Sequence, residues 1–234
     1  GSDPRLVGGA VSPTASVYGE PIILTEDAVV RVRAKVGDQW SAIDEATFEV
    51  GVAAANQSNL KITEFLYHPT GDPDAEFIEL QNVGPLTISL SGVQFEDGVE
   101  FDFTESQVTQ LNPQQRVVVV NRLEAFAQFH DVNGLAIAGE FSDGRLADEG
   151  EPLKLTAADG SVIHDFAYGI PEQGWSSLAA NSGHSLEVVD LNGDYAAPTN
   201  WVASPRPGGT PGRNTLIPGD SDRDGDFDSS DLVL

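Results

Sequence analysis

Six aspartates near the C-terminal end of the sequence have the type and spacing of a calcium-binding loop. They are Asp220, Asp222, Asp224, Asp226, Asp228 and Asp231. Ca²⁺ binds roughly six to eight hard oxygens, which alternate residues of a tight loop can supply from one side. Gly225 stands where such a loop must turn sharply, and Phe227 is apolar, as packing beneath the loop requires. The pattern predicts calcium as a cofactor, and a solvated acidic tail is the alternative.

The remaining polar residues give weaker signals. The four histidines lie far apart in the sequence without the spacing of metal ligands, and we expect them at the surface or in turns: His68, His130, His164 and His184. Two further acidic clusters, at 72–76 and 190–194, could each hold a cation, but plain turns are the simpler interpretation. No serine has the surroundings of a nucleophile elbow, and no glycine-rich phosphate loop is present. The sequence therefore predicts a non-catalytic chain.

Composition limits the partners. The chain of 234 residues has 37 acidic and 12 basic residues, which gives a formal charge of −25. Such a surface repels nucleic-acid phosphates and anionic lipids, so we expect no nucleic-acid partner. No apolar run is long enough to span a membrane. The absence of cysteine excludes disulfides and thiolate metal sites.

Strand patterns dominate the chain and predict an all-β fold. Apolar and polar residues alternate in several segments, whose polar members should face water: 29–36, 47–50, 60–65 and 76–80. Residues 116–120 form a continuous β-branched run, typical of a strand buried on both faces. Further strands are expected at 152–155, 161–166 and 185–189. One helix is predicted over 122–129, with Asn121 as its cap.

Two seams suggest the domain organisation. Residues 51–58 are small and polar, and 204–219 are rich in proline and glycine, as in a tether. We therefore expect a partial β unit over 1–51, a sandwich over 57–170, an extension and linker over 171–215, and the calcium loop over 216–234.

Residues from about 60 to 169 resemble the lamin tail domain, an immunoglobulin-like β-sandwich. The resemblance rests on the order and spacing of several weak motifs: 60–65, 76–82, 88–93, 111–120 and 148–164. It implies a scaffold and interaction module without catalytic residues. The candidate core residues are Ile62, Phe77, Leu80, Leu90, Val118, Leu153 and Leu155. Glu79 and Asn82 are expected to satisfy turn backbone at the end of a strand.

The flanking segments resemble other modules of secreted proteins. Residues 183–187, 200–201 and 208–212 are similar to the tail that often follows bacterial lamin tail modules, which implies a final strand and a packing Trp201. A ligand site at His184 and Trp201 is the alternative. Residues 3–50 resemble the small sandwich at the C-terminal end of chitobiases, and 218–234 resemble the first half of a dockerin, a module that docks on cohesins.

Together these features predict a secreted or cell-surface interaction module of a large modular bacterial protein, with a calcium-dependent docking tail. A cohesin-like or cell-surface protein is the expected partner of the tail. The alternative is an accessory domain of a secreted hydrolase, such as a nuclease, phosphatase or glycosidase, whose catalytic domain lies outside this sequence.

Overall fold

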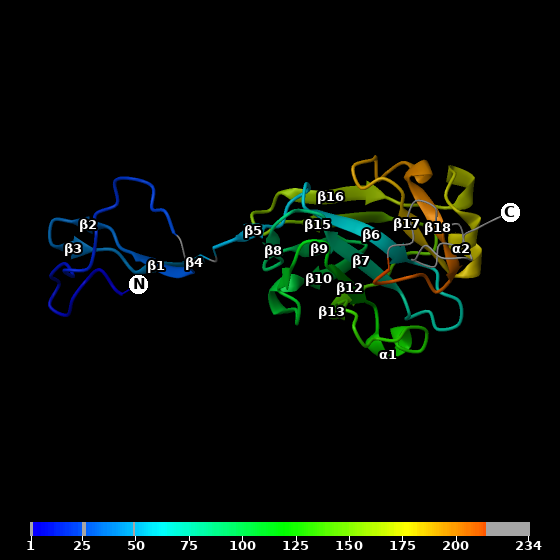
Figure 1. The fold of residues 1–234 in the computed structure, drawn as a ribbon, viewed down its shortest axis with the longest axis horizontal. Coiled ribbons are helices and arrows are strands. Elements are labelled where there is room, and N and C mark those ends of the chain that lie inside the picture. The colour runs from blue at the N-terminus through cyan, green and yellow to red at the C-terminus, as the bar shows by residue number, and fades with distance from the viewer. Residues whose placement is uncertain (1, 25–26, 49, 214–234) are drawn as a thin grey trace. The chain divides into compact units, whose positions relative to one another are not determined.

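The computed structural model describes residues 2–24, 27–48 and 50–213 (Figure 1). The chain divides into two compact units at the junction of Val52 and Ala53. The predicted calcium loop lies outside the described residues. Among the described residues, none forms a helix that is long and apolar enough to cross a membrane.

In the described residues of the first unit, the named strands form two short antiparallel pairs. Strand β1 (Ala28–Val32) pairs with β4 (Asp44–Phe48), and β2 (Lys35–Val36) pairs with β3 (Gln39–Trp40). The segment 29–36 was predicted as one strand, and this is wrong because the ladder is interrupted at Arg33. The next residue, Ala34, bonds Ser41 instead: its amide donates to the Ser41 hydroxyl, and its carbonyl accepts the Ser41 amide. The Arg33 side chain binds the carboxylate of Asp3 and the carbonyl of Ser41.

The first unit has little core. Among its described residues only Ser12 is buried, and large apolar side chains such as Ile23 are exposed. Its resemblance to the chitobiase-type sandwich stays a prediction.

The second unit is a β-sandwich. One sheet has six strands in the order β13-β12-β7-β6-β17-β18, and a second has five in the order β14-β10-β9-β15-β16. The first sheet is antiparallel except for the parallel pair β12 and β13. Its strands are β6 (Leu60–Leu66), β7 (Phe77–Asn82), β12 (Arg116–Val120), β13 (Ile137–Glu140), β17 (His184–Val188) and β18 (Trp201–Pro207).

The second sheet and the connecting elements are shorter. The second sheet contains β9 (Gln94–Asp97), β10 (Val99–Asp102), β14 (Asp143–Gly144), β15 (Pro152–Thr156) and β16 (Val162–Ala167). A small third sheet joins β11 (Gln110–Leu111), β8 (Thr87–Ser89) and β5 (Val52–Ala54). The helices are short: α1 (Leu123–Phe126) and α2 (Ser177–Ser182), with 3₁₀ turns at Phe103–Glu105, Pro171–Gln173 and Pro198–Asn200. The predicted all-β, immunoglobulin-like sandwich is confirmed.

All seven predicted core residues are buried, but they belong to two clusters. Ile62, Leu80, Leu90, Leu153 and Leu155 lie in the main core, which draws side chains from both sheets. Phe77 and Val118 belong to a smaller cluster that also contains Phe126 of α1. The six-stranded sheet therefore buries apolar residues on both faces, as the β-branched run at 116–120 predicted.

Three further predictions from the sequence are wrong. The polar residues of β6 and β7 do not face water, because every residue of both strands is buried. Asn121 does not cap α1, since its side chain donates to Glu76 and the cap residue is Arg122. The first part of the predicted tether at 204–219 is not a linker. Strand β18 continues to Pro207, and Gly209, Thr210 and Pro211 are buried.

Candidate functional site

A row of three glutamates crosses the six-stranded sheet. Glu64 on β6 is the register partner of Glu79 on β7 and of Glu187 on β17. Their relative exposures are only 2%, 0% and 4%. Buried carboxylates need partners, and these three find them in neighbouring side chains and in the segment 209–212, which we call the covering segment.

The covering segment lies over this glutamate row. The Thr210 amide donates to Glu64 at 2.7 Å, and its hydroxyl donates to Glu187 at 2.7 Å. The Gly212 amide donates to Glu79 at 2.5 Å. Gly209 permits this close approach: its φ is +84°, and a Cβ there would lie 2.5 Å from Glu64 Oε1.

The electrostatics of the row favour protonation of Glu64. Burial raises the pKa of Glu64 well above its usual value, and the charges of Glu79 and Glu187 act in the same direction. The Ser185 hydroxyl donates to Glu64 at 2.5 Å and partly opposes the shift. Burial also raises the pKa of Glu79, against the charge of Arg116, which forms an ion pair with it.

The main role of the row is to attach the covering segment to the sheet, although Glu64 and Glu187 also line a small pocket of about 280 Å³. Its oxygens accept hydrogen bonds that attach the covering segment to the sheet, and the carboxylates are shielded from solvent. Glu79 was predicted to satisfy turn backbone, and it does so by accepting the amide of Gly212, but it also pairs with Arg116 and Thr63. Asn82 does bond loop backbone as predicted, since its amide donates to the carbonyls of Leu86 and Leu111.

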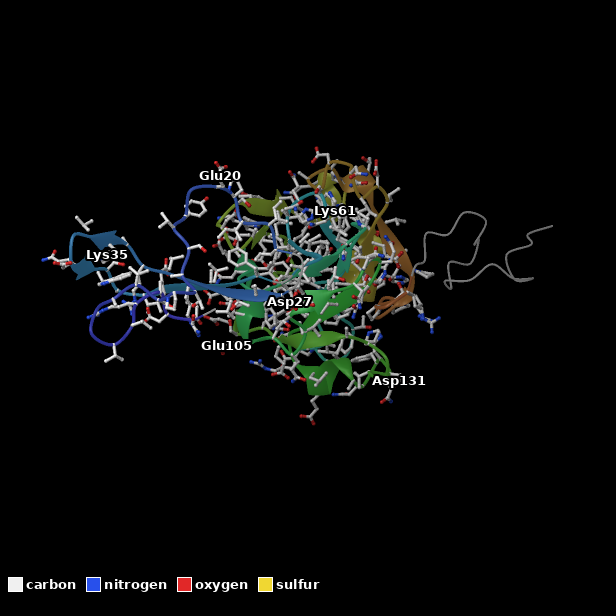
Figure 2. All side chains as sticks on the ribbon, turned by 60° about the vertical axis from the view of Figure 1, so that its left-hand side comes forward. Glu20, Asp27, Lys35, Lys61, Glu105 and Asp131 are labelled. Atoms are coloured by element: carbon white, nitrogen blue, oxygen red, sulfur yellow. The ribbon has the colours of Figure 1, made fainter. Side chains whose placement is uncertain are left out.

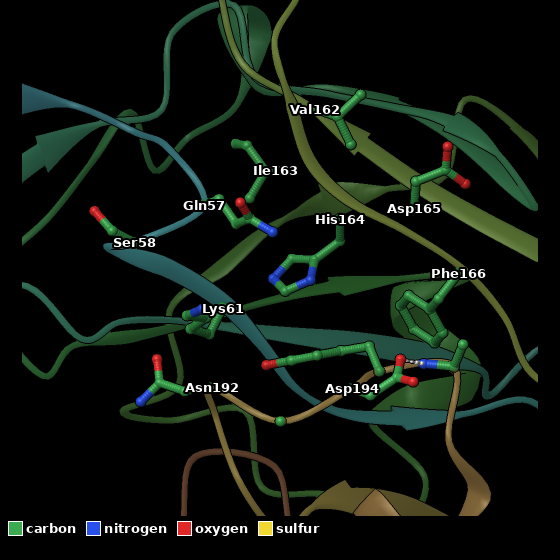
Figure 3. Close-up of a pocket in the computed structure, with 13 residues that line it drawn as sticks. Gln57, Ser58, Lys61, Val162, Ile163, His164, Asp165, Phe166, Asn192 and Asp194 are labelled. Carbon is green, nitrogen blue, oxygen red and sulfur yellow. Dashed lines mark hydrogen bonds between the residues drawn. The ribbon is translucent and has the colours of Figure 1, made fainter.

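A polar pocket of about 520 Å³ opens elsewhere on the sandwich (Figure 3). Three separate segments line it. They are the segment 57–61, which leads into β6 and includes its first residues, strand β16, and the loop at 192–196. The polar or charged lining residues are Gln57, Ser58, Lys61, His164, Asp165, Asn192, Asp194 and Tyr195.

His164 is held firmly at this pocket, and it is only 5% exposed. Its ring packs on Tyr195 with centroids 4.3 Å apart, and the Tyr195 hydroxyl donates to the carbonyl of Ile62 at 3.1 Å. Figure 3 shows the imidazole pointing from β16 toward Lys61. His164 Nε2 is buried without a hydrogen-bond partner among the described residues. Such a group is costly to bury unless something else bonds to it.

Charge at the pocket is mixed. Burial, assisted by the charge of Lys61, lowers the pKa of His164 to about 4, so the imidazole is neutral at pH 7. Burial also lowers the pKa of Lys61, and the charge of Asp190 opposes that shift. Lys61 lies among the side chains of the sandwich in Figure 2. Asp165 and Asp194 are exposed carboxylates at the same pocket.

Replacing His164 with phenylalanine should flatten the acid dependence of stability. The folded-state pKa of about 4 lies below the ordinary 6.5, so the unfolded chain binds more protons as pH falls through this window. His164 therefore removes about 3 kcal/mol of stability between pH 6.5 and 4. Urea denaturation at several pH values should show His164→Phe gaining about 3 kcal/mol relative to the parent as the pH falls from 6.5 to 4, because buried glutamates such as Glu76 contribute equally to both proteins, and a His68→Phe control should follow the parent. An unchanged acid dependence in His164→Phe would show that His164 is not the buried neutral group described.

The other predicted site residues are not brought together. Trp201 is buried in the main core, and His184 bonds the carbonyl of Ser204, so they form no shared ligand site. Asp190 and Asp194 accept backbone amides within their loop, and Asp72 does the same. No group of three or more potential metal ligands gathers within 2–24, 27–48 and 50–213. The prediction that His164 lies at the surface or in a turn is wrong.

Lys61, His164 and Tyr195 were not recognised as site residues from the sequence. No local motif marks them, because they come from positions about 30 to 130 residues apart that only the fold brings together. The one available signal was the order Ile163, His164, Asp165 in a predicted strand. Successive residues of a regular strand face opposite sides, so with Ile163 in the core, His164 is expected on the other face of the sheet.

Comparison with known proteins gives one match. A family model described as Lamin Tail Domain matches residues 53–169, which is half of the chain of 234 residues. No curated protein and no solved structure matches. The matched range covers β6, β7, β12 and the whole second sheet, but it ends before β17 and β18. The chain belongs to the lamin tail domain family.

Proposed function

We propose that this chain is a non-catalytic interaction module of a modular secreted or cell-surface protein. Its sandwich would bind a ligand at the His164 pocket, and its acidic tail would dock on a partner in the presence of calcium. The observation that carries the proposal is the buried, unpartnered Nε2 of His164 at a polar pocket. The membership in a family of immunoglobulin-like interaction domains supports it.

The rigidity of the pocket also supports a binding role. His164 packs on Tyr195, which is itself fixed by its bond to Ile62, so the polar groups are positioned before a ligand arrives. Preorganised groups bind with a smaller entropic cost. Asp194 is fixed by accepting the amide of Ala196 at 2.9 Å (Figure 3).

Chemical-shift mapping tests this function. Amide spectra of the full chain should be recorded with four classes of small probe: carboxylates, inorganic phosphate, amines and neutral sugars. We expect at least one class to shift Lys61, His164 and Asn192 together, with saturation. If no class shifts these residues, the pocket does not bind ligands and the proposal fails.

Calcium should bind the tail, whose loop lies outside the described residues. Calorimetric titration should detect binding that Asp220→Ala and Asp224→Ala each weaken by about tenfold or more, because each removes a charged oxygen ligand. The pair Asp72→Ala and Asp74→Ala removes equal charge from another acidic turn and should leave the titration unchanged. Full binding in both tail variants would place the calcium site elsewhere.

The partner of the tail is proposed to be a cohesin-like or cell-surface protein. Support comes from the spacing of the aspartates and from the resemblance of residues 218–234 to part of a dockerin. Calcium would order such a loop by neutralising the repulsion between its aspartates.

A further inference from the structure

The charges around the His164 pocket indicate which class of ligand it takes, and this inference rests on the proposed function above. We propose that the pocket binds a neutral polyhydroxylated ligand, such as one or two units of a saccharide. The claim concerns the chemistry of the ligand and depends on three features of the lining.

The first feature is the balance of charge. Lys61 brings a positive charge to the pocket, whereas Asp165 and Asp194 bring negative ones. An anionic ligand would meet both carboxylates and the field of a chain with a charge of −25. A cationic ligand would meet the ammonium of Lys61, a residue that is buried and has already lost part of its hydration. A neutral ligand avoids both penalties.

The second feature is the mixture of donors and acceptors. The Lys61 ammonium can only donate, and the carboxylates of Asp165 and Asp194 can only accept. Ser58, Gln57 and Asn192 can do both. A hydroxyl group also donates and accepts, so neighbouring hydroxyls of one ligand could satisfy all of these groups. The unpartnered Nε2 of His164 lies just beneath this lining, and a hydroxyl could bond it in either tautomer of the ring once the lining opens enough to expose it.

The third feature is the size and edge of the pocket. Its volume of about 520 Å³ suits a small organic ligand rather than a folded partner. Val162 contributes an apolar side chain to the lining and is 48% exposed. It offers a contact for the C–H groups that a sugar ring carries between its hydroxyls.

Calorimetry and amide shift mapping with defined probes test the ligand class. The neutral probes are methyl glycosides of glucose, galactose, mannose and N-acetylglucosamine, together with cellotetraose. Glutarate, inorganic phosphate and lysine amide are the charged probes. We expect at least one neutral probe to saturate and to shift Lys61, His164 and Asn192, whereas charged probes of equal concentration do not.

Two variants connect binding to the pocket. His164→Phe keeps an aromatic ring against Tyr195 but removes Nε2, and it should weaken saccharide binding by roughly tenfold, the value of one well-formed hydrogen bond. Asn192→Ala changes an exposed loop residue and should weaken binding without affecting the core. His68→Phe is the matched control and should bind as the parent does.

The possible outcomes distinguish a failure of the saccharide assignment from a failure of the proposed binding function. Pocket shifts with charged probes alone would overturn the saccharide assignment and leave the binding function intact. Saccharide binding that both His164→Phe and Asn192→Ala retain in full would also overturn the assignment. The absence of pocket shifts with every probe would refute both.

Discussion

Replacement of Arg116 by methionine should lower the free energy of unfolding by about 3 to 5 kcal/mol at pH 7. Arg116 forms an ion pair with Glu79, whose side chain is completely buried. Methionine keeps much of the volume of the arginine stem but leaves Glu79 without its cation. Urea denaturation followed by circular dichroism measures the loss directly.

The pH dependence and two further variants identify the cause. Burial raises the pKa of Glu79, so lowering the pH protonates this group and should reduce the cost of Arg116→Met. The double variant Arg116→Met, Glu79→Gln removes both charges and should recover most of the loss. Arg122→Met disrupts an exposed pair with Glu140 at 3.5 Å and should cost less than about 1 kcal/mol. If Arg116→Met lowers the free energy of unfolding by no more than this control does at pH 7, the glutamate row is solvated and does not hold the covering segment on the sheet.

Replacement of Trp201 by alanine should lower the free energy of unfolding by about 3 to 5 kcal/mol, because it leaves a large cavity in the main core. The indole packs edge-on against Phe65 with centroids 5.0 Å apart and stacks on Phe166 at 5.7 Å. Its Nε1 donates to the carbonyl of Tyr195 at 2.9 Å, which links β18 to the loop that lines the pocket. Thermal and urea denaturation should both show the loss.

Trp40→Ala is the matched control for this truncation. Trp40 lies in the first unit, is half-buried and also donates its indole N–H to a carbonyl, that of Gly9. It should leave the unfolding transition of the second unit unchanged. A cost below about 1 kcal/mol for Trp201→Ala would mean that residues beyond 170 do not contribute to the sandwich core.

The fold could be predicted from the sequence because the alternation of apolar residues is strong where the core is largest. Ile62, Leu80 and Leu153 occupy inward positions of regular ladders, and period-two reading identifies such positions reliably. The burial of the other face of the six-stranded sheet could not be predicted from this alternation. That face is buried under α1 at one end and under the covering segment at the other.

A β-bulge explains why the glutamate row was missed. The pairing of β6 with β7 shifts between Ile62 and Glu64, so strict alternation assigns Glu64 and Phe65 to the wrong faces. Phe65 turns into the main core, and Glu64 joins Glu79 and Glu187 on the other side. A bulge leaves no clear mark in a single sequence.

The pocket was missed because its walls are distant in the sequence. His164 was expected at the surface or in a turn, yet Tyr195 packs over it from a loop that joins β17 to β18. That loop lies in the part of the chain that was set apart as an extension. Only the pairing of β17 with β6 brings it back to the sandwich.

Hydrogen exchange of the full chain tests the central claim, that residues 184–212 complete the sandwich and the wall of its binding pocket. The amides of Leu186, Val202, Thr210 and Gly212 should be protected nearly as strongly as those of β6 and β7, and should exchange through global unfolding. Exchange of these four amides at the rate of an exposed loop, with β6 still protected, would contradict the account. In that case the lamin tail sandwich would end near residue 170, and the pocket would have no third wall.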